Sequence, residues 1–152
     1  MEYLDSLFSL NGQVAVVTGG AGVLGGAMAR GLARAGARVA VLGRRREQAE
    51  ATAAAICAAG DEALALPADV LARSQLEAAC ATLISTWGQV DILVNAAGGN
   101  LPAATLPPGH SFFNLPVEGM EPVIALNLQG TLLPSQIFGA EMAQRGRGCI
   151  VN

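Results

Sequence analysis

Residues 14–25 read VAVVTGGAGVLG. Four apolar residues and a threonine, typical of a buried strand, lead directly into glycines 20, 22 and 25, and an alanine-rich helical pattern follows. In a Gly-x-Gly-x-x-Gly turn, Gly20 would turn the chain out of the strand, Gly22 would let the backbone approach a diphosphate, and Gly25 would let the helix pack closely. The N–H groups of the first helical turn would face the anion. The segment therefore predicts a dinucleotide site, the alternative being a glycine-rich turn without a ligand.

The rest of the chain alternates short apolar runs with segments of helical length. This alternation predicts an α/β fold with a Rossmann-type, doubly wound parallel sheet. The expected strands are 14–18, 38–42, 62–66, 90–95 and 149–152, and the expected helices are 22–35, 46–59, 72–87 and one long helix over 117–144. Glycines at 36, 60, 88 and 146 follow these helices, where a left-handed cap forms easily. No repeat or linker divides residues 1–152, so we expect a single dinucleotide-binding domain.

The composition argues against several classes of protein, including nucleic-acid-binding and membrane-spanning proteins. The 152 residues are 52% hydrophobic and 14% charged, well below the roughly 25% charge that is usual for soluble domains. A net charge of -3 with scattered arginines gives no basic surface for nucleic acid. No apolar run approaches the roughly 18 residues that span a bilayer, so no membrane segment is expected. Residues 1–5 lack the basic start of a secretory signal, which makes the cytoplasm the expected location.

Cysteine and histidine give no sign of a metal or redox site. Cys57, Cys80 and Cys149 show no Cys-x-x-Cys spacing, and we interpret them as small buried hydrophobic residues. His110, the single histidine, lies in the irregular stretch 98–116, which is rich in proline and glycine. That stretch follows the fourth predicted strand, at the sheet edge where ligands bind in doubly wound folds. It is either a disordered surface loop or a lid facing a substrate, and His110 is either a loop residue or a substrate contact.

The end of the second predicted strand bears on the choice between NAD and NADP. An acidic residue about 20 residues beyond the glycine turn is typical of NAD binding. Here the strand is followed by Gly43, Arg44, Arg45 and Arg46. A guanidinium group suits the additional 2′-phosphate of NADP, so NADP is favoured over NAD. The alternative is three solvated arginines, one of them paired with Glu47.

Several motifs, taken in their order along the chain, resemble those of the short-chain dehydrogenase/reductase family. They are Thr18 to Gly25, Asp69-Val70 after the third strand, Asn95 to Gly98 after the fourth, Asn127 in the long helix, and Gly148 to Asn152. The resemblance implies that Asp69 and Val70 border the adenine and that Asn127 helps to hold a water molecule in a proton relay. Together with the arginines, the cofactor-binding residues would be Thr18, Gly19, Gly20, Gly22, Val23, Leu24, Gly25, Arg44, Arg45, Asp69, Val70, Asn95, Ala96, Ala97 and Gly98.

The sequence departs from the family in two of these motifs. Ala96 and Ala97 give Asn-Ala-Ala-Gly where Asn-Asn-Ala-Gly is usual, and the glycines follow Gly-x-Gly-x-x-Gly rather than the commoner Thr-Gly-x-x-x-Gly-x-Gly. The Gly-x-Gly-x-x-Gly form, the longer loop after Gly98 and residues 133–142 resemble the branch that acts on sugar acids, such as D-mannonate oxidoreductases. Pro134 and Asn127 also have structural interpretations, as a helix kink and as the cap of a bend.

The family's catalytic residues have no counterpart in these 152 residues. The resemblance implies a serine shortly after the fifth strand and a Tyr-x-x-x-Lys on the next helix, but the chain contains no lysine, and its single tyrosine is Tyr3. We therefore expect the cofactor-binding part of an NAD(P)-dependent oxidoreductase, with the sheet truncated after the fifth strand and association into a homo-oligomer. The substrate of a complete enzyme would be a small carbonyl compound or alcohol. The alternatives are a non-catalytic nucleotide-binding module and a non-functional gene fragment.

Overall fold

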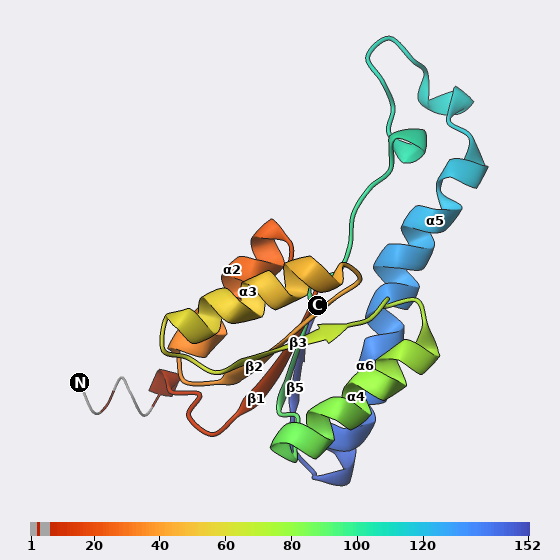
Figure 1. Cartoon of the computed structure of the whole chain (residues 1–152). Helices are drawn as coiled ribbons and strands as arrows, with labels where there is room; N and C mark the ends of the chain where they lie inside the picture. Colours follow the sequence, from red (N-terminus) through yellow and green to blue (C-terminus); the bar gives the residue numbers. More distant parts are fainter. Residues whose placement is uncertain (1–2, 4–6) are drawn as a thin grey trace.

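Five parallel strands form one sheet in the order β3-β2-β1-β4-β5 (Figure 1). The computed structural model describes residue 3 and residues 7–152, so the prediction that residues 1–5 carry no secretory signal falls almost entirely outside the described residues. The strands are β1 (Val14–Thr18), β2 (Arg38–Gly43), β3 (Ala63–Pro67), β4 (Ile92–Asn95) and β5 (Cys149–Val151). The predicted doubly wound α/β sheet is confirmed, and each predicted strand differs from the observed one by at most two residues at an end.

Helices cover both faces of the sheet (Figure 1). One face carries α2 (Val23–Arg34) and α3 (Arg46–Ala58), and the other carries α4 (Arg73–Trp87) and α6 (Gly130–Gln144). In the central strand β1, Val14 and Val16 pack in the cluster with α4 and α6, while Ala15 and Val17 pack in the cluster with α2 and α3. Because successive strand residues point to opposite faces, burial on both sides explains why β1 is apolar throughout. The four glycines that follow the predicted helices all have positive φ, as expected.

The prediction of one continuous long helix over 117–144 is wrong. The structure has a 3-10 turn (η3, Val117–Gly119), a short α5 (Glu121–Ile124), a π-helical segment (η4, Ala125–Gln129) and then α6. Pro122 lies in the first turn of α5 and has no N–H to continue a helix from η3, so helix formation starts again there. Pro134 lies inside α6 and has no N–H to bond the carbonyl of Gly130, the residue directly after the π-helical segment.

Residues 99–119, which follow β4 and are called the arm here, project away from the sheet and carry a single charged side chain, Glu118 (Figure 1). Three 3-10 turns, η1 (Pro102–Ala104), η2 (Phe112–Asn114) and η3, give it local structure. Gly119 packs closely against Ala103, since a Cβ atom on Gly119 would lie 2.9 Å from the carbonyl carbon of Ala103. The start and the end of the arm are therefore in contact. Phe113, in η2, is 92% exposed, and His110 is exposed as well. The stretch predicted as a loop thus consists of short turns closed at their base, and its role as a lid stays a prediction.

A buried carboxylate ties the amino ends of β1 and β4 to the end of α6. Asp91 is 7% exposed, and its Oδ2 accepts hydrogen bonds from the Val14 N–H (2.9 Å) and Gln89 Nε2 (2.8 Å). Its Oδ1 accepts one from Arg145 Nη1 at 3.1 Å. The negative charge and the main-chain donor of β1 therefore satisfy each other inside the protein, as buried polar groups must.

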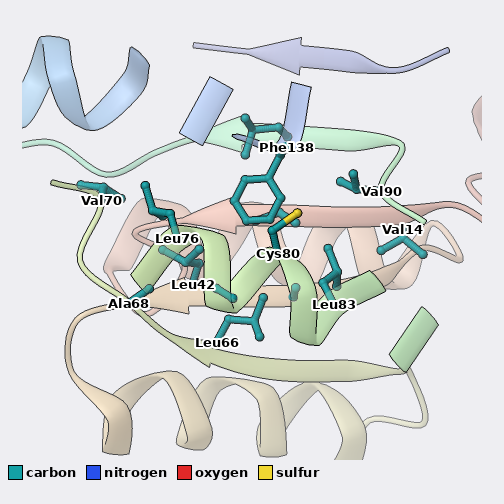
Figure 2. Close-up of a cluster of buried hydrophobic side chains, with 14 of the residues drawn as sticks. Val14, Leu42, Leu66, Ala68, Val70, Leu76, Cys80, Leu83, Val90 and Phe138 are labelled. Atoms are coloured by element: carbon teal, nitrogen blue, oxygen red, sulfur yellow. The ribbon is translucent and has the colours of Figure 1, made fainter. Parts of the chain in front are cut away.

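The core on the α4 and α6 side is built around Phe138, which is fully buried (Figure 2). Cys80 and Leu83 come from α4, and Leu42, Leu66 and Val14 come from the sheet. The predicted burial of Cys80 is confirmed, but Cys57 and Cys149 are exposed. Cys57 lies beside the buried face of α3, which is formed by Ala49, Ala53 and Ile56, and Cys149 lies on the edge strand β5. An apolar helical pattern does not show on which side of its stripe a single residue falls, and this explains the error for Cys57.

We expect the thiol reagent DTNB to label Cys57 and Cys149 in the folded protein at pH 8, but not Cys80. Burial raises the pKa of the Cys80 thiol from its ordinary value of 9.0 to about 11, and the nearby carboxylate of Glu141 adds to this effect. The stabilising effect of this neutral thiol is fully present below pH 9 and is lost as the pH rises towards 11. Colorimetric counting of thiols should give two in native buffer and three in urea. Equal reactivity of all three without denaturant would contradict this packing.

Candidate functional site

A cavity of about 410 Å³ lies at the carboxyl ends of β1, β2 and β4. The chain moves outward from β1 through β2 to β3, then returns to place β4 on the other side of β1. This reversal between β1 and β4 is the switch point at which doubly wound sheets bind ligands. The cavity is lined by Gly19, Ala21, Gly22, Val23, Leu24, Gly25, Gly43, Arg44, Arg45, Ala68, Val70, Ala96, Ala97, Gly98 and Leu126.

Most of the residues predicted as cofactor-binding lie together in this lining. Thr18, Gly20, Asp69 and Asn95 do not line the cavity, although each is next to a residue that does. Four lining residues were missed. Three of them, Ala21, Gly43 and Ala68, adjoin predicted positions and could have been found by including the neighbours of each motif. Leu126 comes from the π-helical segment η4, and no local pattern in the sequence places it there.

The loop between β1 and α2 depends on glycine at several positions, but their roles differ from the prediction. Gly19, and not Gly20, has the left-handed conformation, with φ of +64°, so Gly19 turns the chain out of the strand. A Cβ atom on Gly20 would lie 2.8 Å from the Val17 carbonyl oxygen, so Gly20 is needed for close packing on β1. The assignment of the turn to Gly20 was wrong because the chain turns at Gly19, directly after β1 and one residue before the first glycine of the motif.

The first turn of α2 presents main-chain N–H groups to the cavity. The first hydrogen bond of the α2 ladder runs from the Gly26 N–H to the Gly22 carbonyl at 2.8 Å. The N–H groups of Val23, Leu24 and Gly25 come before it and therefore have no carbonyl partner within the helix. No side chain caps the helix, and its first turn has no acidic residue. A Cβ atom on Gly25 would collide with the Gly19 carbonyl oxygen, so Gly25 lets the helix approach the loop as predicted. This arrangement of free donors at a positive helix end fits an anionic group such as a diphosphate.

A buried hydroxyl group holds the opposite wall of the cavity in place. Thr18 is fully buried, and its Oγ1 accepts hydrogen bonds from the N–H groups of Ala96 and Ala97, both at 3.1 Å. These two alanines line the cavity. Thr18 therefore joins the end of β1 to the segment that leaves β4, and its contribution is to the shape of the site.

Two exposed arginines extend the cavity beyond the end of β2. Arg44 and Arg45 both line it, and neither has an ion pair within residues 7–152. Arg46 differs, since it pairs with Glu50 one turn along α3 at 3.4 Å. The end of β2 thus offers two unpaired guanidinium groups and no carboxylate.

Asn127 connects the base of the arm to η4. Its Nδ2 donates to the carbonyls of Gly99 (2.7 Å) and Val123 (2.8 Å), and its Oδ1 accepts a hydrogen bond from the Gly99 N–H at 3.2 Å. Both the NH₂ group and the oxygen of the side-chain amide therefore have hydrogen-bond partners within the protein. The Asn127 carbonyl accepts a hydrogen bond from the Thr131 hydroxyl at 3.0 Å. A role of Asn127 in a proton relay stays a prediction.

Other kinds of site find no support in the described part of the chain. Among residue 3 and residues 7–152 there is no group of three His, Cys, Asp or Glu side chains placed to hold a metal ion. Within the same residues, every helix is too short or too polar to cross a membrane.

Comparison with known proteins agrees with the geometry of the cavity. The family described as short chain dehydrogenase matches residues 13–152. An uncharacterized oxidoreductase, UxuB, from Bacillus subtilis is 43% identical over 152 residues, which is 95% of this chain and 55% of that protein. The D-threitol dehydrogenase of Mycolicibacterium smegmatis is 36% identical over 149 residues, covering 98% of this chain and 55% of that protein.

A solved structure shows the same arrangement of elements. It is described as a D-mannonate oxidoreductase from Haemophilus influenzae with bound NAD. It superposes with a TM-score of 0.84 at 33% sequence identity, over 91% of this chain and 53% of that one. The chain therefore spans about half the length of the relatives that it matches.

Proposed function

Since the chain belongs to the short-chain dehydrogenase family, we propose that it binds a nicotinamide dinucleotide in the cavity between the β1–α2 loop and Ala96–Gly98. The diphosphate would lie on the free N–H groups of Val23, Leu24 and Gly25. This proposal depends above all on the uncapped start of α2, which opens into the cavity. Val70 and Ala68 would border the adenine. When bound, the nicotinamide ring supplies hydride exchange with a carbonyl or alcohol group of a substrate.

We further propose that NADP is preferred over NAD. Arg44 and Arg45 are unpaired in residues 7–152, line the cavity and follow a strand that ends without a carboxylate. A guanidinium group binds a phosphate with charge-assisted, often paired hydrogen bonds. The 2′-phosphate of NADP would neutralise positive charge that otherwise opposes the dipole of α3, which begins at Arg46.

Replacing Arg44 or Arg45 by alanine is expected to weaken NADPH binding by about 10- to 100-fold and to leave NADH binding nearly unchanged, because only NADPH carries the 2′-phosphate. Fluorescence titration with both nucleotides measures the two affinities. Arg46→Ala is the matched control, since Arg46 is paired with Glu50 and does not line the cavity. If Arg44→Ala and Arg45→Ala leave the ratio of NADPH to NADH affinity at the wild-type value, NADP preference is wrong.

For the whole protein, we propose a cytoplasmic oxidoreductase that acts on a polyol or sugar acid, with these residues as its single cofactor-binding domain. The names of the two relatives above, a D-threitol dehydrogenase and a D-mannonate oxidoreductase, support this substrate class. The serine and the Tyr-x-x-x-Lys would follow Asn152. Reading the coding sequence beyond Asn152 tests this directly, and a stop codon there would contradict it. Saturable nucleotide binding by a protein without these residues would instead indicate a non-catalytic module.

We also propose that the protein forms a homo-oligomer. Ile124 at the end of α5, Leu128 in η4 and Leu132 near the start of α6 are exposed and lie four residues apart, and Val117 in η3 is exposed as well. Large apolar side chains exposed together on one part of a protein are typical of an interaction site. Analytical ultracentrifugation tests this proposal, and a monomer at all concentrations would contradict it.

A further inference from the structure

Three polar side chains meet where β4 and β5 end. Asn95 Nδ2 donates hydrogen bonds to Ser135 Oγ at 3.0 Å and to Asn152 Oδ1 at 2.8 Å. Val94 and Val151 are paired in the sheet, so Asn95 and Asn152 are the next pair of neighbours in the same register. Ser135 comes from α6, which covers this face of the sheet. The cluster therefore joins two strand ends and one helix directly behind Ala96–Gly98, the wall of the cavity.

The direction of each hydrogen bond in this cluster is fixed by Ser135. Its hydroxyl proton is donated to the Thr131 carbonyl at 2.7 Å, so Ser135 Oγ accepts from Asn95. Asn95 must therefore direct its NH₂ group towards Ser135, and its second N–H goes to Asn152. Its Oδ1 is left buried without a hydrogen-bond partner among the residues that the structure describes. An unsatisfied buried acceptor costs about 1–3 kcal/mol, so a donor is expected to reach this atom.

The chain itself indicates where that donor would come from. Asn152 follows the last residue of β5 and is in contact with Asn95. In a parallel sheet the carboxyl ends of neighbouring strands lie at one edge, and here that edge also holds the cavity. A segment that continues beyond Asn152 would pass beside the Asn95 side chain as it leaves the sheet.

We propose that Asn95 is a positioning residue: its buried Oδ1 accepts a hydrogen bond from a main-chain N–H of the first residues that follow Asn152 in the whole protein. The amide then holds β5 through Asn152 and the continuing chain through Oδ1. Asn95 thereby sets where this segment lies relative to Ala96–Gly98. This inference rests on the proposed function, because it concerns a longer enzyme in which that segment carries reacting groups.

The test compares Asn95→Ala with Ser135→Ala in the full-length enzyme. Both variants lose the hydrogen bond between Asn95 and α6, but only Asn95→Ala removes Oδ1 and the contact with Asn152. Misplacement of a reacting group by about 1 Å can cost about 100-fold in rate, so Asn95→Ala should lower kcat by about 10- to 100-fold with little change in nucleotide affinity. Ser135→Ala should lower kcat by less than about threefold. Equal losses in the two variants would assign Asn95 a role in sheet stability alone and overturn the proposal.

Hydrogen exchange gives a second measurement that does not require a variant to fold. In the wild-type enzyme, at least one amide among the first residues after Asn152 should exchange slowly, and Asn95→Ala should accelerate it. If all of these amides exchange at the rate of an unstructured peptide in the wild type, the proposal is wrong. If the wild-type enzyme binds no nicotinamide nucleotide, the proposed function fails, and the exchange rates still decide whether Oδ1 has this partner.

Discussion

Gly25→Ala is expected to weaken dinucleotide binding by at least about tenfold and to destabilise the fold by about 1–3 kcal/mol. The added Cβ atom would overlap the carbonyl oxygen of Gly19 and lie 2.8 Å from its carbonyl carbon and 3.1 Å from the Cα atom of Gly20. All three atoms belong to the main chain, so no side chain can rotate away. The first turn of α2 must move off the loop, and the free N–H groups of Val23 and Leu24 move with it.

Gly31→Ala provides a matched control on the same helix. A Cβ atom on Gly31 would meet no atom within 4 Å beyond its own helix and chain neighbours, so the substitution adds only helix propensity, worth about 0.5–1 kcal/mol of added stability. Urea denaturation and NADPH fluorescence titration of both variants separate the two effects. If Gly25→Ala binds NADPH as tightly as Gly31→Ala, the close approach of α2 to the loop is not needed for binding.

Thr18→Val is expected to lower the free energy of unfolding by about 1–3 kcal/mol, although valine has nearly the same shape as threonine. The hydroxyl group accepts hydrogen bonds from the N–H groups of Ala96 and Ala97. Its removal leaves the Ala97 N–H without this acceptor, while the Ala96 N–H keeps the Val94 carbonyl at 3.2 Å. Because these alanines line the cavity, NADPH affinity should fall in the same variant. Urea denaturation and NADPH titration measure the two losses.

Thr18→Ser separates the hydroxyl group from the methyl group of this side chain. It keeps the acceptor and loses one buried methyl group, which costs about 1 kcal/mol. The expected order of stability is wild type, then Thr18→Ser, then Thr18→Val. A valine variant as stable as the serine variant would show that the Ala97 N–H finds another partner.

The sheet and most of the cavity could be predicted because each strand carries its own signal. β1 is buried on both faces, so it is apolar throughout, and the glycine-rich turn follows it immediately. The lining from Gly19 to Gly25 and from Ala96 to Gly98 then follows from the order of strands. These features depend on residues that are close in sequence.

The remaining features depend on contacts between distant segments. Leu126 reaches the cavity because η4 is π-helical, which changes the direction of each side chain along the helix. Asn95 belongs to a predicted motif, but its side chain points to Ser135 and Asn152 because of packing between α6 and β5. Neither arrangement leaves a pattern within a short window of sequence. The turning role of Gly19 was missed although the end of β1 was predicted correctly, because the Gly-x-Gly-x-x-Gly pattern assigns the turn to its first glycine, Gly20.

The position of β1 between β2 and β4 has a consequence for how the protein acquires its fold. Pairing β1 with β2 closes a short stretch of chain, whereas the hydrogen bond between the Val14 N–H and Asp91 joins residues 77 positions apart. Closing the longer loop costs more chain entropy, and parallel strands separated in this way pair slowly. On the ribosome, one edge of β1 would stay without a partner until β4 has been synthesised. During that interval an apolar strand edge is open to other nascent chains, so chaperone binding should matter most before residue 95 has emerged.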